Sequence, residues 1–243
     1  MKNLFLLMIA GLLWVVPAAA EDESDNADGE HQLTTPAERA AESDYVVLAQ
    51  LDAYKYEEKR KFPVSGDTWF DVLLTYKAPR KIHRLTIFEE GLGDDKCYFD
   101  HVELFGEMPR FLLFLNDDPD SESGKLRGHP DGCAVAVVAT TSNEYVVRWP
   151  LDSMRFEDPE AVEALTKEYD FHGPGAFVNL GELVGYRIEE EAARQHLEKV
   201  EDRRGRHAVY RYTRGIPLNV FRTELIGAEN LKPESKEEED SSS

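Results

Sequence analysis

The sequence predicts an α+β protein that is mainly β, with its strands folded into a small barrel or sandwich. Two observations predict this class. Residues 44–152 contain several short segments rich in β-branched and aromatic side chains, separated by turns rich in glycine, proline and aspartate. Residues 153–232 carry a helix-start signal and apolar residues at helical spacing, so helices are expected to flank the strands in the C-terminal half.

The first twenty residues predict a secretory signal peptide. Lys2 supplies a short positive start, residues 4–16 form an apolar run, and the small residues Ala18 and Ala20 precede Glu21 at the −3 and −1 positions. The apolar run is too short for a good membrane span. We therefore expect cleavage before Glu21 and export to the periplasm or the extracellular space, with no transmembrane segment.

Both ends of the exported chain are acidic and poor in aromatic residues. Residues 21–43 and residues 233–243 contain too little apolar surface to offset the entropy that is lost when a chain is ordered. We expect a mobile acidic segment at the first of these positions and a disordered acidic tail at the second. Neither segment needs a role beyond solvation.

Six strands are expected in the first half of the chain. Residues 44–54 and 110–115 are nearly continuous apolar runs, which is typical of strands that are buried on both faces. Residues 81–89 alternate apolar and polar side chains, the period of a half-buried strand. The six expected strands are 44–54, 68–76, 81–89, 110–115, 133–140 and 144–151.

The C-terminal half begins with a helix signal. Asp158 is a candidate N-cap, Pro159 suits the first helical position, and Gly173 follows the pattern, so a helix is expected near residues 159–170. An imperfect apolar stripe predicts a second helix within residues 180–203. After Gly205 the sequence is consistent with one or two further strands. Residues 153–232 are expected to pack on or beside the barrel.

The chain contains two cysteines, Cys97 and Cys133. An oxidising compartment allows a disulfide to form and persist, so two cysteines in an exported chain indicate one bridge. Free thiols or metal ligands are the alternatives, but no CxxC or Cys/His ligand spacing accompanies either cysteine.

The order of motifs in residues 44–151 resembles the netrin-like module of the tissue inhibitors of metalloproteinases. The family has an opening Val-Val-x-Ala-x-Val strand, a Lys-Gly-type turn after a later strand, a cysteine, a strand of the pattern Gly-x-Arg-(Tyr/Phe)-Leu-Leu-Phe-Leu and a partner cysteine. The matching residues are Val46, Val47, Ala49, Lys77, Cys97, Gly106, Arg110 to Leu115, and Cys133.

This resemblance implies an OB-like, five-stranded Greek-key barrel with helices packed beside it, and a bridge that ties the segment before the Phe-Leu-Leu-Phe-Leu strand to the segment after its loop. It does not imply inhibition of metalloproteases. Those inhibitors chelate the zinc of the protease through an N-terminal cysteine, whereas the expected start of this exported chain is Glu21.

The formal net charge of −20 works against binding to nucleic acid, because such binding depends on neutralising phosphates. It also weakens binding of the whole chain to anionic membranes. No HExxH or GxSxG motif occurs. We expect no cofactor, no resident metal and no catalytic residue that a motif would identify.

Two polar clusters nevertheless merit inspection. The loop that the bridge closes could bring His101 and His129 together with Asp131, either as a metal or acid–base site or as polar residues around a disulfide. Carboxylates in residues 116–122 offer oxygen ligands for calcium, without the central glycine or the spacing of an EF-hand loop. A solvated hairpin tip is the simpler interpretation of that loop.

The stretch from Arg203 to Arg222 contains six arginines and no acidic residue. One interpretation is a face that recognises an acidic protein or an anionic envelope component, since arginine binds carboxylates and phosphates in a bidentate manner. The alternative is internal pairing with the acidic run at residues 189–202. The candidate binding residues are Arg203, Arg204, Arg206, Arg211, Tyr212 and Arg214.

Taken together, these patterns favour an exported, soluble, non-enzymatic binding or accessory protein whose ligand the sequence does not identify. A hydrolytic enzyme with a site between the barrel and the C-terminal half is the first alternative. An envelope structural protein that docks through the segment from Arg203 to Arg222 is the second. The oligomeric state is open.

Overall fold

The computed structural model describes residues 33–93, 95–99, 109–121, 124–151, 153–171, 173–179, 196–200 and 209–233. All of these residues belong to one unit of the chain, residues 32–243. The predicted signal segment and residues 234–243 of the predicted acidic tail lie outside the described residues.

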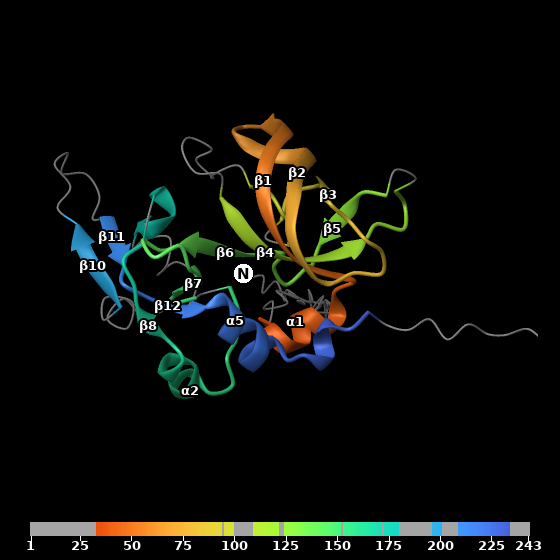
Figure 1. The fold of residues 1–243 in the computed structure, drawn as a ribbon. Coiled ribbons are helices and arrows are strands. Elements are labelled where there is room, and N and C mark those ends of the chain that lie inside the picture. The colour runs from red at the N-terminus through yellow and green to blue at the C-terminus, as the bar shows by residue number, and fades with distance from the viewer. Residues whose placement is uncertain are drawn as a thin grey trace, which may run out of the picture. The chain divides into compact units, whose positions relative to one another are not determined.

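Five strands close into a barrel (Figure 1). Around the barrel β1 pairs with β2, β2 with β3, β3 with β5, β5 with β4, and β4 again with β1. All of these pairs are antiparallel except β3 with β5, which is parallel. This confirms the predicted mainly β, OB-like barrel. The five strands are β1 (Tyr45–Lys59), β2 (Phe62–Lys77), β3 (Arg84–Glu90), β4 (Arg110–Asp117) and β5 (Leu126–Gly128).

The sheet branches at β4. The last three residues of β4 pair with β5 and close the barrel, whereas its first four pair with β6 and extend the sheet outward. The extension continues through β7 and β12 to β8. Its strands are β6 (Ala134–Ala139), β7 (Tyr145–Trp149), β12 (Arg214–Pro217) and β8 (Lys167–Glu168). A separate small sheet has the order β10 (Leu197–Val200), β11 (Val209–Tyr212), β9 (Phe177–Asn179).

The apolar runs of β1 and β4 are explained by burial on both faces. Along β4, Phe111, Leu113 and Leu115 point into the barrel, while Leu112 and Phe114 pack in a second core. The second core is completed by residues of the extension and of the helices, so residues 45–49 of β1 and 111–115 of β4 are buried on both faces. The result is the unbroken apolar pattern that distinguishes such strands from half-buried ones.

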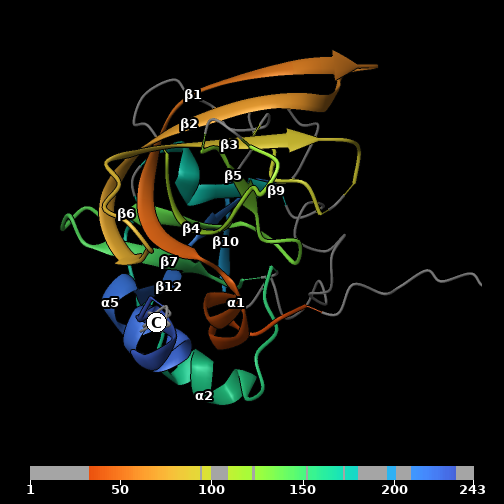
Figure 2. The same ribbon diagram turned by 90° about the vertical axis from the view of Figure 1, so that its right-hand side faces the viewer.

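Short helices cover the outer face of this second core (Figure 2). The N-terminal helix α1 lies beside η2 and η3 near the C-terminal end of the described chain. The helical elements are α1 (Pro36–Glu42), α2 (Pro159–Ala164), η1 (Pro174–Ala176), α5 (Leu218–Val220), η2 (Phe221–Ile226) and η3 (Glu229–Leu231). Within the described ranges, none of these helices has the length and apolarity that a membrane crossing requires.

The structure corrects the expectation of a mobile segment over residues 21–43 for residues 33–43, whereas residues 21–32 lie outside the described residues. Residues 36–42 form α1, which starts with a capping box: the Thr35 side chain accepts from the Glu38 N–H, and the Glu38 carboxylate accepts from the Thr35 N–H. The buried residues Arg39 and Ala40 then dock the helix on the second core. Composition suggested disorder because the helix is held by specific contacts rather than by a large apolar face.

Two predicted helices are also corrected. The helix expected over 159–170 ends at Ala164, because Lys167 and Glu168 pair with β12 as β8. Of the helix expected within 180–203, residues 180–195 and 201–203 lie outside the described residues, and residues 197–200 form β10 instead. The predicted strands are confirmed, although β1 and β2 are longer than expected and form a hairpin that reaches past β3.

Candidate functional site

The two cysteines form the predicted disulfide. Cys97 and Cys133 have Cα atoms 5.9 Å apart, and Cys97 is buried in the barrel core. The bridge joins the segment after β3 to the start of β6 and so fixes both ends of the loop that contains β4 and β5. Neither cysteine is free, which excludes the thiol and metal-ligand alternatives. A stable bridge is consistent with export to an oxidising compartment.

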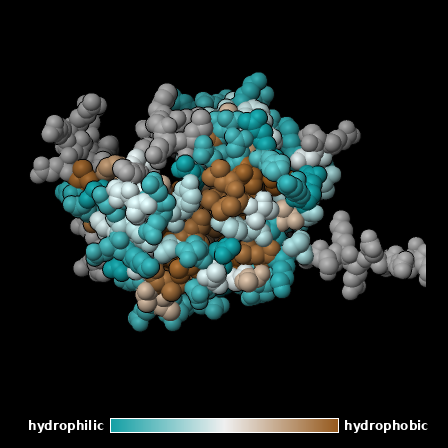
Figure 3. All heavy atoms as spheres, viewed as in Figure 1, coloured by the Kyte–Doolittle hydropathy of each residue, from teal (hydrophilic) through white to brown (hydrophobic). Residues whose placement is uncertain are grey.

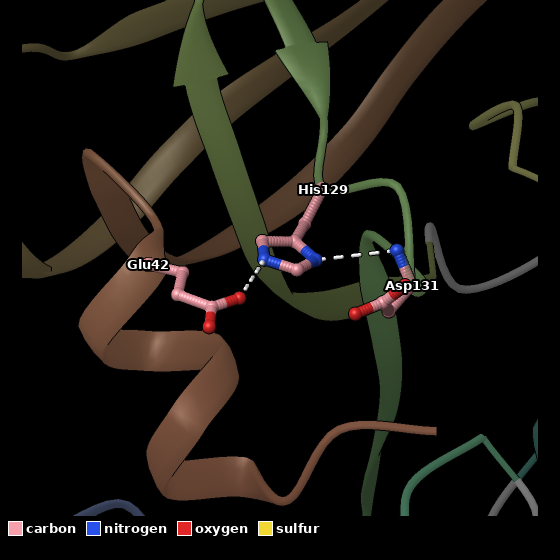
Figure 4. Close-up of side chains that lie close together, drawn as sticks. All are labelled: Glu42, His129 and Asp131. Carbon is pink, nitrogen blue, oxygen red and sulfur yellow. Dashed lines mark hydrogen bonds and ion pairs between the residues drawn. The ribbon is translucent and has the colours of Figure 1, made fainter. Parts of the chain in front are cut away.

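A cluster of three titratable side chains lies where α1 meets the turn after β5 (Figure 4). Glu42 is the last residue of α1, His129 directly follows β5, and Asp131 lies two residues further on. His129 Nε2 lies 3.2 Å from Glu42 Oε2, and the potential ligand atoms of all three side chains lie within 4.8 Å of one another. The imidazole is buried, whereas Glu42 is exposed.

The hydrogen bonds of His129 define its protonation. Its Nδ1 accepts from the backbone N–H of Asp131 at 3.2 Å, so in the neutral ring the proton resides on Nε2 and is donated to Glu42. Burial lowers the pKa of His129, and the nearby Arg39 guanidinium lowers it further, while Asp131 and Glu42 act in the opposite direction. The net result is a neutral imidazole at neutral pH.

This arrangement suits a structural hydrogen bond better than metal binding or acid–base catalysis. One imidazole and two carboxylates are a donor set that zinc and related metals accept. A metal on Nε2, however, would require the proton on Nδ1, where the Asp131 N–H already donates. Neither ring nitrogen has a free lone pair for a general base. We interpret the Glu42–His129 contact as a hydrogen bond that fastens α1 to the barrel.

Two buried cations support the same junction. The Arg39 side chain is fully buried; its Nη2 donates to the carbonyls of Asp131 at 2.7 Å and of Ser153 at 2.8 Å. Lys77 Nζ donates to the carbonyls of Ala40 at 3.0 Å and Ala41 at 2.9 Å, in the last turn of α1. A cation at this end of a helix is favourable, because the carbonyls there carry partial negative charge.

Replacing His129 with glutamine is expected to reduce the loss of stability on acidification. The folded pKa of His129 is lowered, so below the ordinary value of about 6.5 the unfolded chain binds the proton more readily than the folded chain. The stabilisation is therefore present above that pH and is lost as the pH falls. Urea unfolding at pH 7 and pH 5 measures the slope, with the exposed His83→Gln as the control. An unchanged slope in His129→Gln would contradict this assignment.

The sequence placed His129 and Asp131 together, and the structure confirms that proximity. His101, the third residue of that hypothesis, lies outside the described residues. Glu42 was missed, because it lies 87 residues from His129 and was assigned to a mobile segment. No local pattern in the sequence connects the two.

The candidate basic face is only partly described, since Arg203, Arg204 and Arg206 lie outside the described residues. Arg211 pairs with Glu198 at 2.6 Å and with Asp170 at 3.3 Å, and these carboxylates raise its pKa. Glu198 belongs to the acidic run at residues 189–202, so this ion pair is of the kind that the alternative interpretation, internal pairing, expects.

The other two candidate residues of this face are also engaged within the protein. Arg214 Nε donates to Thr166 Oγ1 at 2.9 Å. Tyr212 is buried beneath the Arg148 guanidinium, which lies 4.7 Å from its ring centroid. Recognition of an anion by this face therefore stays a prediction.

The carboxylates of the acidic loop likewise have partners within the protein. Asp117 accepts from the Tyr45 hydroxyl at 2.9 Å, and the buried Asp118 pairs with Arg127 at 3.1 Å. Glu122, the last of the candidate calcium ligands, lies outside the described residues. The described contacts agree with a hairpin whose acids stabilise its own turn.

A groove of about 280 Å³ lies between the end of β2 and the C-terminal helical segment. Two of the residues that line it are in contact: the Arg222 guanidinium lies over the Tyr76 ring, 5.4 Å from the centroid. Leu73 and Leu74, the preceding residues of β2, are 41% and 50% exposed. Figure 3 shows hydrophobic surface in the middle of one face of the molecule. The groove is lined by Thr75, Tyr76, Arg222, Thr223, Ala228 and Leu231.

The outer edge of β2 is open beside this groove. On its inner side β2 pairs with β1 as far as Lys77, whereas on its outer side β3 pairs with it only as far as Asp71. In the described part of the chain, no strand therefore covers the outer edge of residues 73–76. An open edge that carries exposed leucines is a surface that can pair with another strand.

Comparison of the chain with protein-family models, with curated proteins and with solved structures found no match.

Proposed function

We propose that this chain is an exported, non-enzymatic binding or accessory protein that takes up an extended polypeptide segment along the outer edge of β2. The observation that carries the proposal is the open, apolar edge at residues 73–76 beside the groove at Tyr76 and Arg222. Soluble proteins usually shield such edges with charges, prolines or a covering element.

The groove chemistry indicates the kind of segment that would bind. A strand added to an edge gains its affinity from backbone hydrogen bonds, and its alternate side chains select pockets. Leu74 and Leu231 offer apolar contacts, while Arg222 offers a cation for a carboxylate. The proposed ligand is therefore an extended segment with apolar residues next to an acidic one.

The scaffold is proposed to be netrin-like. The closed five-stranded barrel and the bridge between Cys97 and Cys133 support this assignment. Inhibition of metalloproteases through an N-terminal cysteine is not proposed, since the sequence has none in that position. A hydrolytic activity finds little support at His129, because both of its ring nitrogens are occupied by hydrogen bonds.

Replacing Leu74 with lysine is expected to weaken peptide binding by at least about tenfold, because it removes an apolar contact and places a charge at the edge. A displayed library of unstructured peptides would be screened for binding to the exported protein. The Kd values of the selected peptides would then be measured by titration. Hydrogen exchange of the complex should show new protection at residues 73–76.

Leu92→Lys is the matched control, because Leu92 is an exposed leucine on a distant loop, with 67% of its surface accessible. It should leave Kd unchanged. Selected peptides that bind Leu74→Lys as tightly as the unaltered protein would contradict the proposed edge. If the purified protein still hydrolysed an ester or peptide substrate, the result would favour the alternative function of a hydrolytic enzyme.

A further inference from the structure

The tip of the β1–β2 hairpin combines three successive cations with an exposed aromatic ring. Lys59, Arg60 and Lys61 are all exposed, and the Phe62 side chain that follows is 65% exposed. In the described part of the chain, none of these three side chains has a hydrogen bond or an ion pair. The exposed carboxylates of Glu57 and Glu58 directly precede them, so residues 57–61 carry three positive and two negative charges, a net charge of +1, in a protein whose formal net charge is −20.

The backbone of this tip is unusual for the residues that occupy it. Lys59 pairs with Phe62, so Arg60 and Lys61 form a two-residue turn, and their φ angles are 55° and 70°. Positive φ at both central positions defines a type I′ turn, for which Asn-Gly is strongly preferred. A side chain makes this conformation costly. Folding alone would favour asparagine and glycine here, so the two charges indicate a role outside folding.

The hairpin also carries its tip away from the acidic body. The last pair between β2 and β3 joins Ser65 to Glu90, and Figure 2 shows the hairpin reaching beyond this point. Ser65 pairs with Glu57 across the hairpin, and at about 3.3 Å per residue the remaining residues place the tip roughly 10 Å further out. That separation is comparable to the screening length of about 8 Å at physiological ionic strength. The tip can therefore meet an anion with less repulsion from the body, and the nearest carboxylates, Glu57 and Glu58, are outnumbered by its three cations.

We propose that residues 59–62 form a docking tip for the surface of a bilayer that contains anionic lipids. The three cations would contact phosphate headgroups, and the Phe62 ring would enter the apolar boundary below them. A tip of four residues is too small for a specific protein interface, which needs about 800 Å² from each partner. A bilayer is soft and densely charged, so a small convex tip can engage it. This contact is separate from the proposed peptide edge of β2.

The test compares vesicles of phosphatidylcholine alone with vesicles of equal parts phosphatidylglycerol and phosphatidylcholine. The protein is purified in the form that an expression host exports. Vesicle flotation then measures the fraction of protein bound to the vesicles, at low salt and at about 0.5 M NaCl. Binding is expected only to the anionic vesicles, with a marked loss at high salt. Equal binding to both kinds of vesicle, or none to either, would overturn the proposal.

The decisive variant is Arg60→Asn with Lys61→Gly. Each cation near an anionic surface raises binding roughly fivefold, so the double change should lower vesicle binding about 25-fold. It should also raise Tm, because Asn-Gly suits the turn. Phe62→Ser should lower binding severalfold and leave its salt dependence unchanged. A loss of binding accompanied by a higher Tm cannot be attributed to misfolding.

Lys81→Gln with Lys232→Gln is the matched control, since it removes two exposed cations elsewhere and changes the net charge equally. It should keep the binding of the unaltered protein. An equal loss in this control would show a general charge effect and overturn the proposal. Binding of soluble polyglutamate through the tip, without binding to anionic vesicles, would also overturn it and assign the tip to an acidic polypeptide.

Discussion

Replacing Arg39 with methionine is expected to lower the free energy of unfolding by about 3 kcal/mol. The change leaves the buried carbonyls of Asp131 and Ser153 without the guanidinium that donates to both. It also removes the contact with Phe114, whose ring centroid lies 5.8 Å from the guanidinium carbon. Methionine fills part of the space, and it relieves one cost, since the buried Arg39 Nη1 has no hydrogen-bond partner among the described residues. Urea unfolding measures the difference.

Arg155→Met is the control for this prediction. Arg155 pairs with Glu38, which lies on α1 together with Arg39. The Arg155 side chain is 44% exposed, however, and exposed ion pairs contribute only about 0–1 kcal/mol to stability. Hydrogen exchange should show α1 losing protection first in Arg39→Met, because that residue joins the helix to the turn after β5 and to the segment before α2. Equal stability losses in the two variants would contradict a central role for the buried guanidinium.

The barrel could be predicted because its information is local. The runs at residues 45–49 and 111–115 are apolar on both faces, and such runs identify buried strands without knowledge of their partners. Cys97 and Cys133 could be paired because the chain offers only one pairing.

The helix α1 and the site beside it could not be predicted in this way. Arg39 is a charged residue in an acidic, alanine-containing segment, and its burial depends on carbonyls 92 and 114 residues away. The same holds for Glu42 and His129. Contacts between polar groups that are distant in sequence leave no periodic pattern, so composition indicated mobility where the fold provides specific partners.

The hairpin tip illustrates a different limit. Its charges are visible in the sequence, but the positive φ angles of Arg60 and Lys61 are not. As long as the turn type is unknown, three cations in a row look like those of an ordinary solvated loop. The structure makes them informative, because it shows that the residues are poorly suited to the backbone that they occupy.

Replacing Gly128 with alanine is expected to destabilise the protein by at least about 3 kcal/mol. A Cβ atom at this position would lie 2.6 Å from the Cβ of Cys97 and 2.7 Å from the Cβ of Cys133. It would also lie 3.1 Å from Glu89 Oε1, the atom that accepts from the Gly128 N–H. The cysteine atoms cannot rotate away, because each Cβ is attached to the backbone and the bridge holds the two together. Urea unfolding and a count of alkylatable thiols measure the outcome.

A double-mutant cycle distinguishes this clash with the disulfide from a general destabilisation by any side chain at this position of β5. With both cysteines replaced by alanine, the protein should lose about 4 kcal/mol, the chain-entropy contribution of a loop of this size. In that background the two Cβ atoms can move apart, so Gly128→Ala should cost at least about 1 kcal/mol less than in the bridged protein. Gly175→Ala is the matched control, since the nearest atom to its added Cβ lies at 3.4 Å, an ordinary contact. Equal costs of Gly128→Ala with and without the bridge would show that the disulfide does not impose the requirement for glycine.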